Sequence, residues 1–254
     1  MQQGDMGIEA QDLSVKELSQ LSHRVQSEPA PRVRAVIFDL DGTLIDSEPN
    51  YFLADRELLG RYGVPFTEAE KRRYIGSSNL AMMEDFVQRY GLQVAPAALA
   101  AEKNELYLRI AEAHTPVFPQ MRRFLDLLVA HHVPVAVASG SGLEVIRRLV
   151  KQVGLDGPFA HLVSADEVAH GKPAPDVFLE AARRLGVAPT ACLVVEDACP
   201  GVEAAHRAHM RCIAVPTLTD PPLPATFGLA DLLFPEGMDS FDPDRAWAWV
   251  QGQC

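Results

Sequence analysis

The sequence predicts an α/β fold in which a parallel sheet, covered by helices on both faces, carries an inserted helical domain. Short, almost wholly apolar segments alternate with amphipathic segments of helical period over most of the chain. Strands that are buried on both faces have such continuous apolar runs, which is typical of a parallel sheet. Residues 48–115 break the alternation and contain no strand-like run.

Five segments of the strand type follow the first thirty residues. They are VRAVIF (33–38), PVAVAS (134–139), HLVSA (161–165), ACLVVE (191–196) and RCIAVP (211–216). The helical segments between them have proline near their starts, as at Pro175, and glycine after their ends, as at Gly186. Strands that alternate with helices in this way predict right-handed crossovers within one sheet.

The breaks in the pattern divide the chain into three parts. Residues 1–30 are a leader or appendage with one short amphipathic segment, and residues 31–47 and 116–254 form the α/β core. Residues 48–115 form the inserted helical cap. Because this insertion follows the carboxyl end of the first strand, it is expected to lie over the edge where α/β proteins bind ligands.

Composition and charge exclude several classes of function. The formal net charge of −11 argues against a nucleic-acid or anionic-membrane surface, both of which need basic patches. The chain has no apolar run of the ~18 residues that a membrane span needs. It shows no signal-peptide pattern, and its four cysteines form no CxxC pair. These features predict a cytoplasmic protein.

Two acidic residues, Asp39 and Asp41, directly follow the first strand. An EF-hand calcium loop that began at Asp39 would need Gly and Glu where Leu44 and Asn50 stand. A dinucleotide fingerprint in SGSGLEV would need a third glycine where Val145 stands, and this turn does not belong to the first strand. Neither alternative explains the aspartate pair.

Three later strands are also followed by polar residues, namely Ser139-Gly140, Lys172 and Glu196-Asp197. Each has an ordinary explanation alone, as a helix N-cap, a solvated loop lysine or a turn. Together they meet the aspartate pair at one edge of a parallel sheet. Four carboxylates at that edge need a compensating cation, and hard oxygen ligands favour Mg²⁺.

Four motifs, in this order, carry a family resemblance: FDLDGTLIDSE, ASGS, GKPAPDVFLEAA and VVEDACPGVEAA. They resemble the haloacid dehalogenase superfamily, and more narrowly its branch of helical-cap phosphatases and β-phosphoglucomutases, over residues 33–236. The resemblance implies a Rossmann-like core, Mg²⁺ as cofactor and phosphoric monoester hydrolase activity on a small phosphorylated metabolite.

The resemblance also assigns roles to the acidic residues. Asp39 matches the nucleophile that forms an aspartyl-phosphate, and Asp41 matches the general acid that protonates the leaving alkoxide and then activates water. Asp39, the backbone carbonyl of Asp41 and Asp197 match the Mg²⁺ ligands. Glu196 matches an outer partner of the metal site or an alternative ligand.

The remaining core motifs match groups that hold the phosphoryl group. Ser139 and the amide of Gly140 correspond to the phosphate-binding residues of the family. Lys172 corresponds to the cation that neutralises Asp39 and the phosphate. Phosphoryl transfer depends chiefly on such positioning and charge stabilisation.

Cap residues depart from the mutase pattern. Asn79 stands where β-phosphoglucomutases have an arginine for a second phosphate, and Tyr51 stands where they have a histidine. Both departures favour hydrolysis. Tyr51, Ser77, Ser78, Asn79 and Lys103 are the candidates for substrate specificity, although a solvated helix surface is preferred for Lys103.

Three functions are therefore compared. A Mg²⁺-dependent phosphatase of a sugar phosphate or related metabolite is preferred. A sugar phosphomutase and a catalytically silent binding or regulatory module are the alternatives. No nucleic acid or membrane partner is expected, and a monomer is favoured.

Overall fold

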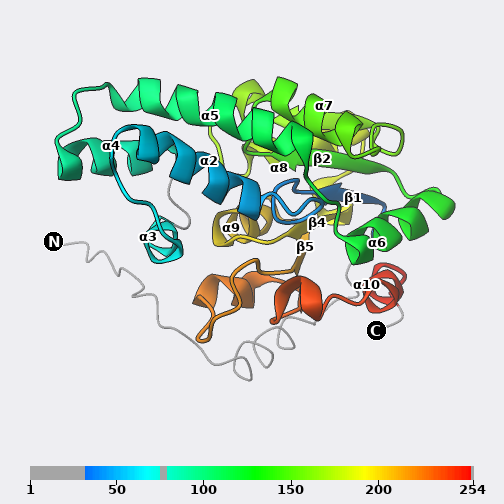
Figure 1. The fold of residues 1–254 in the computed structure, drawn as a ribbon. Helices are drawn as coiled ribbons and strands as arrows, with labels where there is room; N and C mark the ends of the chain where they lie inside the picture. Colours follow the sequence, from blue (N-terminus) through cyan, green and yellow to red (C-terminus); the bar gives the residue numbers. More distant parts are fainter. Residues whose placement is uncertain (1–31, 75–78, 253–254) are drawn as a thin grey trace, which may run out of the picture.

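Six parallel strands form the central sheet in the order β3-β2-β1-β4-β5-β6 (Figure 1). The predicted fold class is thereby confirmed. The five expected strands form, and a short sixth strand was not predicted because two residues give no periodic signal. The strands are β1 (Ala35–Phe38), β2 (Val135–Ser139), β3 (His161–Ser164), β4 (Cys192–Glu196), β5 (Arg211–Ala214) and β6 (Leu232–Leu233).

The computed structural model describes residues 32–74 and 79–252. The predicted leader, residues 1–30, and the specificity candidates Ser77 and Ser78 lie outside the described residues. Within the described ranges, no helix has the length and apolar character needed to span a membrane.

Helices cover the sheet and fill the long insertion. Those of the insertion are α2 (Glu48–Arg61), α3 (Glu68–Arg72), α4 (Asn79–Tyr90) and α5 (Pro96–Ala113). Those of the core are α6 (Pro119–Ala130), α7 (Leu143–Gln152), α8 (Asp176–Leu185), α9 (Cys199–Arg207) and α10 (Pro243–Val250). We use the name helical insertion for α2–α5, which follow β1 and precede β2 in the chain (Figure 1).

The alternation of side chains along β1 divides the core into two layers. Val36 and Phe38 pack in the cluster that includes residues of α6, α7, α10 and the helical insertion. Ala35 and Ile37 pack on the opposite face, in the cluster that includes residues of α8 and α9. All four side chains are fully buried, which explains why the sequence of this strand is apolar without interruption.

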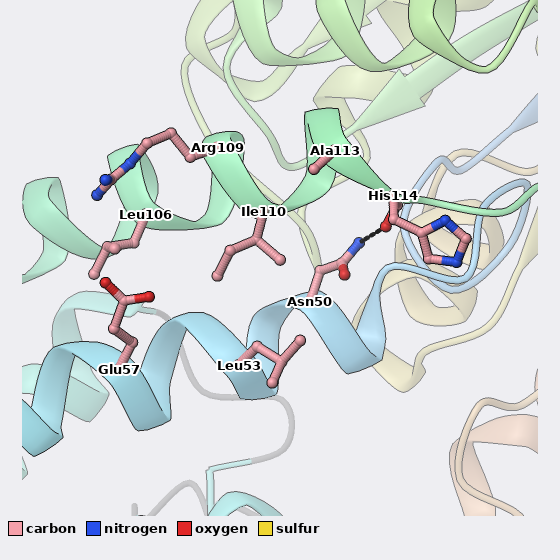
Figure 2. A pocket seen from close by; sticks show the side chains of 8 residues that line it. All are labelled: Asn50, Leu53, Glu57, Leu106, Arg109, Ile110, Ala113 and His114. Atoms are coloured by element: carbon pink, nitrogen blue, oxygen red, sulfur yellow. Dashed lines mark hydrogen bonds between the residues drawn. The ribbon is translucent and has the colours of Figure 1, made fainter.

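The two connections between the helical insertion and the core lie against each other. Asp46 donates its backbone N–H to the carbonyl of Pro116 at 2.9 Å. The buried Asn50, on α2, donates through Nδ2 to the carbonyl of His114 at 3.0 Å and to Thr115 Oγ1 at 2.8 Å. Figure 2 shows Asn50 beside His114 at one end of a groove between α2 and α5. One side chain therefore joins the entry to the exit of the insertion.

We predict that Asn50→Ala lowers the free energy of unfolding by about 1–3 kcal/mol, because it leaves buried acceptors without a donor. Urea denaturation measures the loss. His114→Ala is the matched control, since His114 contributes its backbone and its side chain is exposed. It should change stability by less than about 0.5 kcal/mol. Equal losses in the two variants would contradict the role of the Asn50 amide.

Candidate active site

The polar residues at the carboxyl ends of β1, β2 and β4 line one cavity of about 570 Å³. The sequence-predicted residues that line it on the core side are Asp39, Asp41, Ser139, Gly140, Lys172, Glu196 and Asp197. The structure thus brings together all the core residues that the motifs singled out. Strand register causes this convergence, because the carboxyl ends of neighbouring parallel strands meet at the same edge.

Lys172 lies at the centre of the carboxylates. Its Nζ is 2.5 Å from Asp39 Oδ1 and 2.7 Å from Glu196 Oε1, and it donates to the carbonyl of Ala138 at 3.2 Å. The ammonium therefore has an acceptor for each of its three protons. Its side chain also lies over the ring of Phe178, with Nζ 4.7 Å from the ring centroid.

Burial and mutual repulsion make the ionised form of this carboxylate cluster costly. Desolvation raises the pKa of Asp39 to about 8, although Lys172 opposes the rise and Glu196 and Asp41 add to it. Desolvation also raises the pKa of Asp197 well above its ordinary value, helped by Glu196 and Asp39. Burial acts to lower the pKa of Lys172, but Asp39 and Glu196 outweigh it and raise that pKa. One lysine does not neutralise the group.

Glu196 is engaged on both oxygens. Oε1 contacts Lys172, and Oε2 accepts the backbone N–H groups of Asp197 and Ala198 at 2.9 and 2.8 Å. Gly201, in the first turn of α9, lies directly against this carboxylate, since a Cβ there would come within 1.7 Å of Oε1. These contacts favour a supporting role for Glu196 over direct ligation of a metal.

Asp197 is anchored by two threonine hydroxyls. Thr217 donates to Oδ2 at 2.6 Å and Thr43 donates to Oδ1 at 3.3 Å. Gly42 permits the approach, because a Cβ on it would come within 2.4 Å of Asp197 Oδ2 and its φ is +77°. The sequence reasoning missed Thr217, although its place just after β5, at the same sheet edge, was a usable signal.

Asp41 is held from two sides. Tyr107 on α5 donates its hydroxyl to Oδ1 at 2.8 Å, and Ser141 donates its hydroxyl to Oδ2 at 3.0 Å. Burial raises the pKa of Asp41, and the hydrogen bonds from Tyr107 and Ser141 oppose the rise. A carboxyl group whose pKa is raised is suited to give up a proton near neutral pH.

The turn after β2 is shaped by serine hydroxyls. Ser139 Oγ accepts the backbone N–H of Ser141 at 3.0 Å, and Ser164 Oγ donates to the carbonyl of Ser141 at 2.7 Å. Ser139 is buried, whereas Gly140 is exposed and no atom lies within 4 Å of the position of a Cβ. Gly140 is thus exposed and lines the cavity.

The helical insertion contributes neutral and acidic groups to the cavity, namely Glu48, Tyr51, Asn79, Asn104 and Tyr107. Asn79 Nδ2 donates to Asn104 Oδ1 at 3.2 Å. The rings of Tyr51 and Tyr107 stack with centroids 3.9 Å apart and planes 5° apart. Asn104 and Tyr107 were not among the predicted residues, although their spacing of three on a helix places them on one face.

Lys103 does not line this cavity. Its Nζ pairs with Asp55 Oδ1 at 2.7 Å between α5 and α2, and only 3% of the residue is exposed. The expectation of a solvated helix surface at this position is wrong. The helix face that carries Lys103 packs inward, so Lys103 is buried next to the carboxylate of Asp55.

Comparison with known proteins identifies the class to which this fold and site belong. The family model described as haloacid dehalogenase-like hydrolase matches residues 33–209. The chain belongs to this family, and it is a phosphoric monoester hydrolase of the haloacid dehalogenase type. The expected family and enzyme class are confirmed.

Two relatives with phosphatase names illustrate the similarity. Fructose-1-phosphate phosphatase YqaB of Escherichia coli is 36% identical over 186 residues, which is 72% of this chain and 97% of that protein. The phosphorylated carbohydrates phosphatase of Thermotoga maritima is 30% identical over 210 residues, covering 80% and 95%.

Solved structures share the fold at lower identity. β-Phosphoglucomutase from Clostridium difficile superposes with a TM-score of 0.69 at 20% identity, covering 87% of this chain and 98% of that one. CbbY from Rhodobacter sphaeroides, in complex with phosphate, gives 0.70 at 24%, covering 81% and 95%. These two likenesses establish the architecture alone.

We predict that Gly201→Ala lowers the free energy of unfolding by about 1–3 kcal/mol, because a methyl group there displaces the Glu196 carboxylate. Gly60→Ala is the matched control, since Gly60 also lies in a helix and its Cβ would meet no atom within 4 Å. That change should stabilise by about 0.5–1 kcal/mol. Urea denaturation compares the two, and a neutral or stabilising Gly201→Ala would contradict the close contact.

Proposed function

We propose that this protein hydrolyses the monophosphate ester of a sugar or related polyol through an aspartyl-phosphate on Asp39. The observation that carries the proposal is the single cavity that holds Asp39, Asp41 and Lys172 beside the turn of Ser139 and Gly140. The names of the two phosphatase relatives support a phosphorylated carbohydrate as the class of substrate.

The chemistry divides into two proton-balanced steps. Asp39 attacks phosphorus, the bond from phosphorus to the leaving oxygen breaks, and Asp41 gives that oxygen a proton. A water molecule then attacks the aspartyl-phosphate, and the Asp41 carboxylate takes up a proton from it. Inorganic phosphate leaves, and Asp39 returns to its carboxylate form. Ser139 Oγ and the Gly140 amide hold phosphoryl oxygens throughout.

The carboxylate cluster fits a divalent cation, and we assign Mg²⁺ to it. The fit rests on the donor set, because several core carboxylates line the cavity with Lys172 as the one cation among its described lining residues. The raised pKa values of Asp39 and Asp197 agree with this, since ionising both without a further cation is costly. The described residues contain no group of three or more His, Cys, Asp or Glu side chains arranged to hold an ion alone. Two carboxylates plus the backbone carbonyl of Asp41 suit Mg²⁺, which retains water and accepts phosphate oxygen. The cation supplies charge stabilisation for the transferring phosphoryl group.

The helical insertion, within residues 48–115, acts in this proposal as the cap that selects the leaving group. Its described lining residues include the Asn79–Asn104 amide pair and Glu48, and none of them is a cation. Lys71 of α3, which does not line the cavity, is paired with the lining residue Glu48 at 2.7 Å. Such a surface favours neutral hydroxyl groups and disfavours a second phosphate, so hydrolysis is favoured over the mutase reaction.

A panel of phosphate esters tests the proposal. We expect Mg²⁺-dependent release of phosphate from hexose and hexitol monophosphates, and weaker release from sugar bisphosphates because the cap offers them no cation. Asp39→Asn should lower turnover by at least about a thousandfold, since it removes the nucleophile. Interconversion of sugar 1- and 6-phosphates without net phosphate release would support the mutase instead. Absence of phosphate release from every ester would overturn the proposal.

We further predict that the stabilisation by Mg²⁺ grows with pH. The raised pKa of Asp39 means that the metal-free folded protein binds more protons than the unfolded chain between the ordinary carboxyl pKa and about 8. Its free energy of unfolding therefore falls as pH rises through that window. Mg²⁺ binds the ionised carboxylates, so it restores at most about 1.4 kcal/mol per pH unit for each proton displaced.

Thermal denaturation with and without Mg²⁺, at constant ionic strength from pH 5 to 8, measures this effect. The increase in Tm on adding Mg²⁺ should be small at pH 5 and largest at pH 8. In Asp197→Asn, which removes a proposed ligand, the increase should be largely lost. A Mg²⁺ effect of equal size at every pH would show that the ion binds elsewhere.

A further inference from the structure

The hydrogen bond from Tyr107 to Asp41 joins the helical insertion to the core at the reacting centre. Tyr107 belongs to α5, whereas Asp41 follows β1, and the two oxygens are 2.8 Å apart. The other oxygen of Asp41 receives the hydroxyl of Ser141, from the turn after β2, at 3.0 Å. The carboxyl group is therefore held between two donors that come from different parts of the fold.

Tyr107 is itself held in place. Only 3% of the residue is exposed, and its ring lies parallel to that of Tyr51 at a centroid distance of 3.9 Å. A tyrosine has two rotatable side-chain bonds, and stacking of the ring fixes the direction of the hydroxyl. The donor to Asp41 is thus set in position by packing within the helical insertion.

We propose that Tyr107 is a positioning residue for proton transfer, which together with Ser141 fixes the orientation of the Asp41 carboxyl group. The inference rests on the proposed function. Tyr107 donates to Oδ1 and Ser141 donates to Oδ2, so each oxygen of the carboxyl group has one donor and the plane of the group is set. Oδ2 lies next to Ser141, on the side of the Ser139–Gly140 turn where the phosphoryl group is placed.

The same bond serves both steps. In the first, the P–O bond breaks, its electron pair stays on the leaving oxygen, and the proton of the Asp41 carboxyl group moves to that oxygen. In the second, the ionised Asp41 takes a proton from the attacking water, and the Tyr107 hydroxyl still donates to Oδ1. A hydrogen bond to a charged carboxylate is stronger than one to a neutral group, so Tyr107 also stabilises the ionised form.

A series of aryl phosphates, from p-nitrophenyl to phenyl phosphate, tests the inference with Tyr107→Phe. p-Nitrophenolate leaves without help from an acid, whereas less acidic phenols need the proton. We expect kcat/KM for p-nitrophenyl phosphate to fall less than about threefold and that for phenyl phosphate to fall about 10- to 100-fold, part of the gain that a general acid supplies.

The control is Tyr74→Phe, which also removes a tyrosine hydroxyl from the helical insertion. Tyr74 donates to Asp85 and does not line the cavity, so its loss should produce no trend across the series. Combined with Asp41→Asn, Tyr107→Phe should have no additional effect, because the two residues act through one proton. Equal losses on all esters, or additive losses with Asp41→Asn, would overturn the inference.

Ser141→Ala provides a second test that leaves the helical insertion intact. It removes the donor to Oδ2 while retaining the backbone of the turn, so its penalty should also increase toward phenyl phosphate. A flat penalty would overturn the shared positioning of Asp41, even where Tyr107→Phe reduces folding yield. If the wild-type protein releases phosphate from neither sugar nor aryl esters, the proposed function fails first, which separates the two conclusions.

Discussion

The ion pairs of Lys172 are the interaction on which the site depends. A parallel sheet places the ends of β1 and β4 side by side, and each end carries carboxylates that burial makes costly. Lys172 contacts Asp39 and Glu196 together, so one cation stabilises both strand ends. Glu196 in turn accepts the backbone N–H groups of Asp197 and Ala198, which directly precede α9. The contacts of Lys172 and Glu196 thus neutralise charge and also hold the ends of β1 and β4 to the start of α9.

The core and the helical insertion supply different kinds of side chain to the cavity. The core supplies the carboxylates and Lys172, while the helical insertion supplies amides, tyrosine hydroxyls and Glu48. Among the described lining residues, the one cation, Lys172, comes from the core. In the proposed reaction, the phosphoryl group is therefore compensated from the core, and the rest of the substrate meets groups that add no positive charge. The Tyr107–Asp41 bond is the point where these two sets of residues act on one another.

The sequence predicted the sheet and the residues at its carboxyl edge. A residue that directly follows a parallel strand, such as Asp39, must lie at that edge wherever the strand takes its place in the sheet. Positions on helices were harder, since the side of a helix that meets a cavity depends on how that helix docks. Tyr107 was missed for this reason. Lys103 was misjudged because its partner Asp55 lies on another helix, and sequence alone does not pair them. Thr217 was missed, despite its place just after β5, because it belongs to none of the four motifs.

The hydrogen bonds of Asn50 join the start of the helical insertion to its end. The segments that enter and leave α2–α5 meet there, so the two ends of the insertion lie side by side. The described part of the segment between these two ends contains α2–α5 and no strand of the sheet. Exchange of this segment would not remove any residue that pairs β1 with β2 or β4. Under the proposed function, such an exchange would replace the groups that meet the leaving group and also Tyr107, the insertion's donor to Asp41. Asp39 and Lys172 would stay with the core. A new insertion would therefore have to supply its own donor to Asp41 as well as a new surface for the substrate.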